Sequence, residues 1–437
     1  MRKAVVAGVV VIVVAGAGYL GAQAYSSQRF DDEVGKLVAR MDASPAWNVK
    51  RDQIDAGWFH SSGRIMATYR DAPPDQPVVI EMPYQADHGL LETKLAGEGQ
   101  VKVGDDTLFG DLLQSQQSLR WSGRFLTREQ KLEAKVEVPS ISQQVSVPAS
   151  EIDGEMIPAR DLQVDFGGLT LDITQHEDSL TLNGTSPMLH LADDQADVRL
   201  ENLGLEGQFQ GDEQAFEQSL TLTLPTTTVT PNGSPDVVTQ DVSYALRAKL
   251  DADAFDAHFD ADLGETRLQN QTLLKGGMSM TLDHVDGDAY RALASGLDAH
   301  WPAIQSALDA EDDNALAQAL TPVQPAIHDI LAGSPQLSLD RLQADSALLG
   351  MQMTGKGRLA FDGEQLPAWG PQALDRVSTT RDLIRRMQGQ LTLTGAPPLL
   401  ALALGLPLAN GPLQVGLDDG VLTVNGQPMP LLPPASP

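Results

Sequence analysis

The sequence predicts a mainly β (α+β) protein, with long, curved antiparallel sheets and a helical insert behind one N-terminal transmembrane helix. Three observations predict this fold class. Apolar and polar residues alternate over much of residues 46–288, which is typical of strands with one buried and one solvated face. A helical period replaces this alternation over residues 289–333. An uncharged apolar run follows two cations at the N-terminus, as in a membrane-spanning segment.

The N-terminal element is a predicted signal-anchor, a transmembrane helix over residues 1–25. Arg2 and Lys3 precede an apolar run from Ala4 to Ala22. A helix of about 22 residues, at roughly 1.5 Å per residue, is about 33 Å long and can cross a bilayer core. Because the cationic flank stays on the cytoplasmic side, we expect a single-pass protein of the inner membrane with its bulk in the periplasm. The inner membrane is therefore its first expected partner.

Two further interpretations of this segment stay open. Residues 22–24, Ala-Gln-Ala, have the small-x-small form of a cleavage site, so the alternative is a protein secreted to the periplasm after cleavage near Ala24. The apolar run is longer than the usual core of a signal peptide, which favours the anchor. Gly8, Gly16 and Gly18 offer a small-residue face for helix packing, and a homodimer is therefore one expected assembly.

A juxtamembrane helix is predicted over residues 26–45. Phe30, Val34 and Leu37 recur at helical spacing, and Ser44-Pro45 ends the pattern. This helix would lead the chain from the membrane to the first strand.

Residues 46–288 form the predicted β-rich periplasmic domain. No helical stretch separates its consecutive strands, so the pattern favours antiparallel meanders over βαβ units. Breaks that contain glycine are interpreted as turns between these strands. They are Asn183-Gly184, Gly204, Asn232-Gly233 and Gly276-Gly277.

Residues 289–333 form the predicted helical insert, and residues 334–437 form a C-terminal β-rich region. The insert is rich in Ala and Leu and is interrupted by prolines. Within the C-terminal region we expect one helix near residues 373–387. We also expect a hairpin at Asp418-Asp419-Gly420, because this tripeptide separates two alternating runs.

Composition excludes several classes of function. The 437 residues carry a formal charge of −29, which argues against a nucleic-acid partner because phosphate contacts need a basic face. The chain has no cysteine, so disulfides, thiolate metal sites and cysteine nucleophiles are excluded. Its eight histidines include no closely spaced pair, and no nucleotide-binding or hydrolase motif is present. We therefore expect no catalytic residue, no metal ligand and no cofactor.

Two residue patterns have both a structural and a functional interpretation. The acidic stretch over residues 250–264 lacks the ligand order of a calcium loop, and it is interpreted as a solvated strand face. Met278 and Met280, like Met351 and Met353, lie at strand spacing. These methionines either fill a core or line an adaptable surface that faces lipid.

Several motifs resemble those of one bacterial family. A Gly-aromatic-aromatic step, Gly57-Trp58-Phe59, precedes Ser61-Ser62, then comes His88-Gly89, and Asn425-Gly426 stands before a proline-rich tail. This arrangement resembles the YdgA-like family of bacterial proteins, which are anchored in the inner membrane and face the periplasm. The proline that usually follows the His-Gly pair in that family is Leu90 here. The resemblance implies a location and an architecture, but no biochemical activity.

The motif residues also have a structural interpretation. Gly57 permits a backbone turn that a side chain would obstruct, and Trp58 and Phe59 can attach the first hairpin to the core. Asn425-Gly426 is predicted to form a turn. We therefore expect structural roles for these residues rather than binding roles.

The expected function is that of a non-catalytic envelope protein with a scaffolding or binding role, whose partner is a lipid or an envelope protein. One alternative is a carrier of hydrophobic ligands, in which the apolar face of a sheet forms a groove for acyl chains. A further alternative is a hydrolase whose site is assembled from distant carboxylates. An apolar sheet face that is open to solvent would favour the carrier, and a face covered by helices would favour the scaffold.

Overall fold

The computed structural model describes most of the chain after residue 26. The described ranges are 27–36, 38–39, 42, 47–70, 72, 77–108, 118–147, 150–152, 155–157, 159–212, 214–269, 271–310, 312–348, 350–369, 377–397 and 411–429. The predicted signal-anchor over residues 1–25 lies outside them. Within these ranges, no helix combines the length and the apolar character needed to cross a bilayer.

Antiparallel strand pairing organises the two compact units of the chain, Met1–Asp193 and Asp194–Pro437. Every strand pairing among the described residues is antiparallel. Strands far outnumber helices in the described ranges. The predicted mainly β fold class is therefore confirmed. The division between the units falls inside the predicted β-rich region 46–288, which contributes strands to both.

The first unit contains thirteen strands in its described part. They are β1 (Trp47–Asp55), β2 (His60–Tyr69), β3 (Val78–His88), β4 (Glu92–Val103), β5 (Asp106–Thr107), β6 (Leu119–Leu126), β7 (Lys131–Val138), β8 (Ile141–Val147), β9 (Ser150–Ile152), β10 (Glu155–Ile157), β11 (Arg160–Phe166), β12 (Leu169–His176) and β13 (Ser179–Ala192). Ten of them pair in the order β1-β2-β3-β4-β6-β7-β12-β13-β11-β8. A helix over residues 27–36 precedes β1.

The sheet of the first unit has an apolar face and a charged face. Its core cluster lies on the apolar face and includes a side chain from the helix; the members are Phe30, Tyr84, Ala86, Leu95 and Phe125. On the opposite face, the guanidinium of Arg64 donates to both carboxylate oxygens of Asp52, at 2.9 and 2.8 Å. The alternation of the sequence thus separates a dry face from a wet one.

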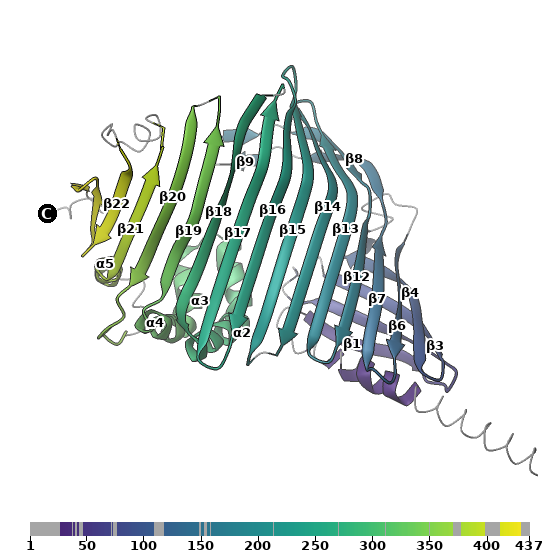
Figure 1. The fold of residues 1–437 in the computed structure, drawn as a ribbon. Coiled ribbons are helices and arrows are strands. Elements are labelled where there is room, and N and C mark those ends of the chain that lie inside the picture. The colour runs from purple at the N-terminus through teal and green to yellow at the C-terminus, as the bar shows by residue number, and fades with distance from the viewer. Residues whose placement is uncertain are drawn as a thin grey trace, which may run out of the picture. The chain divides into compact units, whose positions relative to one another are not determined.

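The second unit is a meander of strands interrupted by helices (Figure 1). Its described strands are β14 (Ala196–Gly211), β15 (Phe216–Pro231), β16 (Val237–Leu250), β17 (Ala254–Leu268), β18 (Gln271–Asp286), β19 (Gln336–Ser346), β20 (Met351–Phe361), β21 (Met387–Thr394), β22 (Leu413–Asp418), β23 (Val421–Val424) and β24 (Gln427–Met429). Its helices are α2 (Gly287–Asp309), α3 (Asp313–Leu320), η1 (Thr321–Val323), α4 (Gln324–Ala332) and α5 (Val377–Arg385). Each strand pairs with the next along the chain, including β18 with β19 across the helices.

Several strands are longer than the sequence predicts, because three of the expected turns are absent. Asn183-Gly184, Gly204 and Gly276-Gly277 lie inside β13, β14 and β18, and the turn prediction at these three positions is wrong. A Cβ at Gly276 would lie 2.2 Å from the main-chain oxygen of Gln343. Glycine at that position therefore permits the close approach of a neighbouring strand rather than a change of direction.

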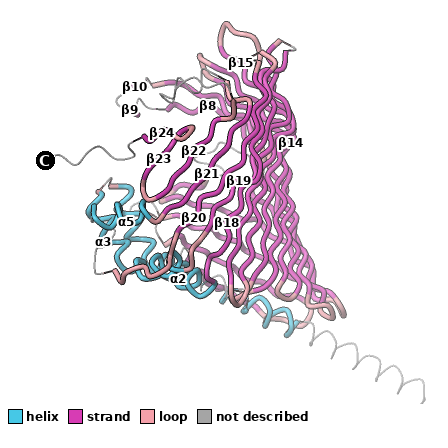
Figure 2. Tube along the Cα trace, turned by 60° about the vertical axis from the view of Figure 1, so that its left-hand side comes forward, coloured by secondary structure: helices cyan, strands magenta, loops and turns pink. Residues whose placement is uncertain are grey.

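Helices α2, α3 and α4 gather at one end of the strands of the second unit (Figures 1 and 2). The carboxylate of Asp286 caps α2 by accepting from the amide of Ala289 at 2.8 Å. The ring of Tyr290 stacks on that of Phe255 with centroids 3.9 Å apart, and burial raises the pKa of the Tyr290 phenol. The helices thus close the core at this end of the sheet.

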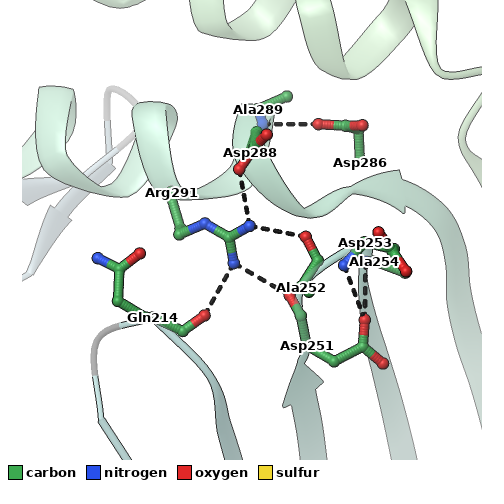
Figure 3. Close-up of polar contacts among 9 residues, drawn as sticks. All are labelled: Gln214, Asp251, Ala252, Asp253, Ala254, Asp286, Asp288, Ala289 and Arg291. Carbon is green, nitrogen blue, oxygen red and sulfur yellow. Dashed lines mark hydrogen bonds and ion pairs between the residues drawn. The ribbon is translucent and has the colours of Figure 1, made fainter.

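Arg291 fastens α2 to two strand connections (Figure 3). Its guanidinium donates to the main-chain oxygens of Gln214, Asp251 and Ala252, at 2.8, 3.0 and 2.9 Å. It also donates to the carboxylate of Asp288 at 2.8 Å. One charged side chain therefore satisfies carbonyl groups of both connections that would otherwise need water.

Candidate functional site

Two strand connections of the first unit meet at one corner of its sheet. The amide of His88 donates to the main-chain oxygen of Phe59 at 2.7 Å, and the amide of Gly89 donates to the main-chain oxygen of Glu92, also at 2.7 Å. These bonds bring the connection between β1 and β2 beside the connection between β3 and β4. The structure therefore brings together Gly57-Trp58-Phe59 and His88-Gly89, which the sequence shows only as separate motifs.

His88 braces this corner from inside. Its side chain is buried, with an exposed fraction of 5%. Its Nε2 lies 2.8 Å from Oγ of Ser61, and its Nδ1 lies 3.0 Å from Oγ1 of Thr93. Burial lowers the pKa of the imidazole, with a smaller contribution from His60. His88 is therefore neutral at pH 7 and joins β2, β3 and β4 through both ring nitrogens.

The Ser61–His88 pair has the atom types of a nucleophile and a base, but its surroundings favour a structural role. The ring centroid of Phe30 lies 5.4 Å from that of His88, and Phe30 is itself 2% exposed. In a catalytic triad a carboxylate contacts the second ring nitrogen of the histidine and stabilises the protonated imidazole. Here the hydroxyl of Thr93 occupies that place. At 5% exposed, the imidazole lies inside the corner rather than on its surface.

The outer surface of the same corner is apolar and exposed. Trp58, Phe59, Leu90 and Leu91 all project to solvent, Trp58 with 59% and Leu91 with 68% of their surface accessible. We call these four residues the apolar corner. The interpretation that Trp58 and Phe59 attach the hairpin to the core is therefore wrong. A Cβ at Gly57 would lie 2.4 Å from the main-chain oxygen of His60, which supports the predicted tight turn.

The closing motif lies in the second unit and forms a turn, as predicted. Asn425 and Gly426 have φ values of 49° and 78° and connect β23 to β24. The side-chain oxygen of Asn425 accepts from the amide of Gln414 at 2.9 Å. The motif therefore holds a hairpin against β22.

One face of the second unit is a continuous apolar surface. Cross-strand partners place large apolar side chains in register from β15 to β19: Leu220 opposite Leu246, Leu246 opposite Phe259, Phe259 opposite Met280, and Met280 opposite Leu339. Directly paired residues lie on the same side of a sheet. We define the apolar face of the second unit as Leu220, Leu222, Tyr244, Leu246, Phe259, Met278, Met280, Leu337, Leu339, Leu359, Leu391, Val415 and Leu417.

This apolar face is open over much of its length in the described part of the chain. Leu220 and Leu246 expose 46% and 41% of their surface. Farther along, a hollow of about 370 Å³ lies between Met278, Leu339 and Leu391. Helices α2 and α4 cover the end near Phe255. Met278 and Met280 line this hollow, so of their two interpretations the adaptable surface fits better than a filled core.

The opposite face of the same strands is charged. Asp260 lies 2.9 Å from Nε2 of His258, and Asp262 accepts from Arg341 at 2.7 Å. At the strand end, hydrogen bonds from the amides of Ala254 and Asp253 lower the pKa of Asp251. The acidic stretch 250–264 is thus a solvated strand face and a turn, and within the described ranges no cluster of three potential ligands could hold a metal ion.

A second carboxylate cluster, in the first unit, bears on the hydrolase alternative. Asp165 accepts from Ser142 at 2.5 Å and lies 3.0 Å from Nδ1 of His190. Hydrogen bonds from Ser142, Gln163 and His190 lower the pKa of Asp165. The carboxylate lies between the hydroxyl and the imidazole, which is not the Ser–His arrangement of a nucleophile and its base. The cluster instead joins β8, β11 and β13.

Comparison with known families gives one match. A family model described as "Bacterial protein of unknown function (DUF945)" matches residues 1–404. No curated protein and no solved structure matches the chain. The match supports the general part of the resemblance drawn from the motifs, namely that the chain belongs to a bacterial family of unknown function. The turn at Asn425-Gly426 lies beyond the matched residues.

Proposed function

We propose a function for this chain, which belongs to the bacterial DUF945 family of unknown function. The protein is a non-catalytic component of the cell envelope, and it holds hydrocarbon chains of lipids on the apolar face of its second unit. Its N-terminal run anchors it in the inner membrane, and both units face the periplasm. The observation that carries this proposal is the open, continuous apolar face from Leu220 to Val415.

The chemistry of the apolar face suits a hydrocarbon ligand. The row through Leu246, Phe259, Met280 and Leu339 contains no hydrogen-bonding side chain. A partner with polar groups would lose hydration there without gaining hydrogen bonds, whereas an acyl chain has no such groups to satisfy. Exposed apolar patches of this kind mark binding surfaces in soluble domains, and the hollow of about 370 Å³ falls within the range of small-molecule sites.

The location supports the same function. An apolar run after two cations predicts a cytoplasmic N-terminus and an exported bulk. A protein held at the inner membrane lies beside a source of lipid, so its open face would meet that ligand at high effective concentration. The strongly negative charge of the chain disfavours a grip on anionic headgroups, which leaves hydrocarbon as the recognised part.

The test compares two double variants on opposite faces of the same two strands. Leu220→Gln with Leu246→Gln alters a cross-strand pair of the apolar face, and Ser219→Gln with Arg247→Gln alters the adjacent pair on the polar face. Full-length protein is extracted from membranes, washed in detergent and examined by native mass spectrometry for phospholipid. Losing two Leu contacts of about 0.7 kcal/mol each should lower lipid affinity about tenfold.

Wild type and the polar-face variant should retain lipid, and the apolar-face variant should lose most of it. All four positions lie in strands that pair through main-chain groups, so the substitutions should leave the pairing intact. Circular dichroism checks that each variant is folded. Wild-type protein without lipid, or equal retention by both variants, would overturn the proposal, because annular lipid around the anchor is common to all three proteins.

A further inference from the structure

The apolar corner of the first unit is tied to the start of the described chain. Oγ of Ser27 donates to the main-chain oxygen of Gly57 at 2.8 Å, and Gly57 directly precedes Trp58. Ser27 also lies two residues after Tyr25, where the predicted membrane-spanning run ends. One hydrogen bond therefore places the turn that presents Trp58 next to the point where the chain would leave the bilayer.

Chain geometry limits how far the apolar corner can lie from that membrane. Consecutive Cα atoms are 3.8 Å apart, so the Cα of Tyr25 lies at most about 8 Å from that of Ser27. The headgroup layer on each side of a bilayer is about 5–8 Å deep. A span that ends at Tyr25 therefore puts Gly57 and its neighbours at the level of the headgroups or immediately above them.

We propose that the apolar corner is a membrane-docking surface, in which Trp58, Phe59, Leu90 and Leu91 enter the periplasmic headgroup layer of the bilayer that holds the N-terminal run. Trp and other amphipathic aromatic side chains favour this layer because the ring is apolar while its N–H stays hydrated. The side chains come from two connections, so the contact fixes the orientation of the first unit and not merely its distance from the membrane.

The corner is preorganised for this contact. The hydrogen bond from His88 to Phe59 and the buried contacts of the His88 imidazole with Ser61 and Thr93 hold both connections in place. The exposed side chains therefore need no rearrangement of the main chain before docking, which limits the entropy lost on binding. Leu90 adds a further exposed apolar side chain to this surface.

This inference rests on the membrane anchor proposed above but not on lipid binding by the second unit. A second copy of the chain could also cover an apolar surface, and the anchor decides between the two occupants. The bilayer is present at the corner whatever the concentration of protein, whereas a second copy must be brought there. The membrane is therefore the partner that the tie between Ser27 and Gly57 favours.

The absence of cysteine allows a direct test. Trp58→Cys, Leu91→Cys and the control Asp105→Cys each introduce one thiol for labelling with an environment-sensitive nitrobenzoxadiazole dye. Asp105 is exposed and lies in the turn after β4, at the opposite end of that strand from Leu91. The full-length proteins are reconstituted into vesicles of phosphatidylethanolamine and phosphatidylglycerol. Quenching is measured with lipids brominated in the acyl chain and with iodide in the water.

Labels at positions 58 and 91 should shift to the blue, lose fluorescence to brominated lipid and be shielded from iodide, while the label at 105 should show the reverse. Protein that floats with the vesicles but has labels at 58 and 91 open to iodide would overturn the docking surface and leave the anchor intact. Labels shielded from both quenchers would indicate a protein partner, such as a second copy, and would also overturn it. Failure to float would reject the anchor together with this inference, independently of lipid retention by the second unit.

Discussion

The imidazole Nε2 of His88 lies 2.8 Å from Oγ of Ser61, across the pairing of β3 with β2. This contact links two motifs that are 27 residues apart. It lies directly beneath the apolar corner, so the state of one buried side chain determines how firmly both connections are held. Protonation of His88 should therefore affect both the stability of the first unit and the geometry of the apolar corner.

The first prediction concerns pH. Burial lowers the folded-state pKa of His88, so the unfolded chain, with a histidine pKa of about 6.5, binds more protons below that pH. Stability contributed by neutral His88 is complete above about pH 6.5 and declines as the pH falls toward the lowered folded-state pKa. Thermal unfolding between pH 8 and pH 5 should show this loss in wild type and a smaller one in His88→Gln.

The control for this experiment is His176→Gln, at an exposed position on the end of β12. It removes one histidine of the same unit without disturbing the corner, so it should keep the wild-type slope. Identical slopes for His88→Gln and wild type would show that His88 is not the group responsible.

The second prediction concerns Arg291, the residue that fastens α2 to the strand connections. Arg291→Gln removes a guanidinium that donates to three main-chain oxygens and one carboxylate, and should cost about 2 kcal/mol. Amide hydrogen exchange in α2 should become faster than in wild type. Arg247→Gln, whose side chain is 64% exposed and makes a 3.7 Å ion pair, should change stability by less than about 0.5 kcal/mol. Equal effects of the two substitutions would contradict this role.

The third prediction compares one chemical change at two glycines of the first unit. A Cβ at Gly97 would lie 2.0 Å from the main-chain oxygen of Pro83 and 2.6 Å from Nε1 of Trp121, so Gly97→Ala should destabilise by about 1–3 kcal/mol. A Cβ at Gly35, in the helix over residues 27–36, would meet nothing within 4 Å, so Gly35→Ala should stabilise by about 0.5–1 kcal/mol. The denaturation midpoints of the full-length variants show whether each substitution stabilises or destabilises the protein. A loss of stability from Gly35→Ala, or none from Gly97→Ala, would contradict the observed spacing.

Local patterns account for much of the fold that the sequence predicts. Alternation at Leu220, Leu222 and Tyr244 indicates strands, and the Ala/Leu-rich stretch after residue 289 indicates helices, because both periods are properties of consecutive residues. The turn at Asn425-Gly426 follows in the same way, since only certain residues adopt its positive φ values. The errors at Gly204 and Gly276 have a different origin. A glycine that ends a strand and one that admits a neighbouring strand look alike along the chain.

The sequence by itself determined the mainly antiparallel class, the order of strands and helices, and the separation of apolar from charged faces. Only the tertiary structure decided that Trp58 and Phe59 face solvent, that His88 reaches Ser61, and that the face around Leu246 and Met280 stays open between the strand ends. The physical reason is that side-chain alternation fixes which residues share a face, whereas exposure depends on what other parts of the chain pack on that face. Those contacts join residues far apart in the sequence, and no local pattern records them.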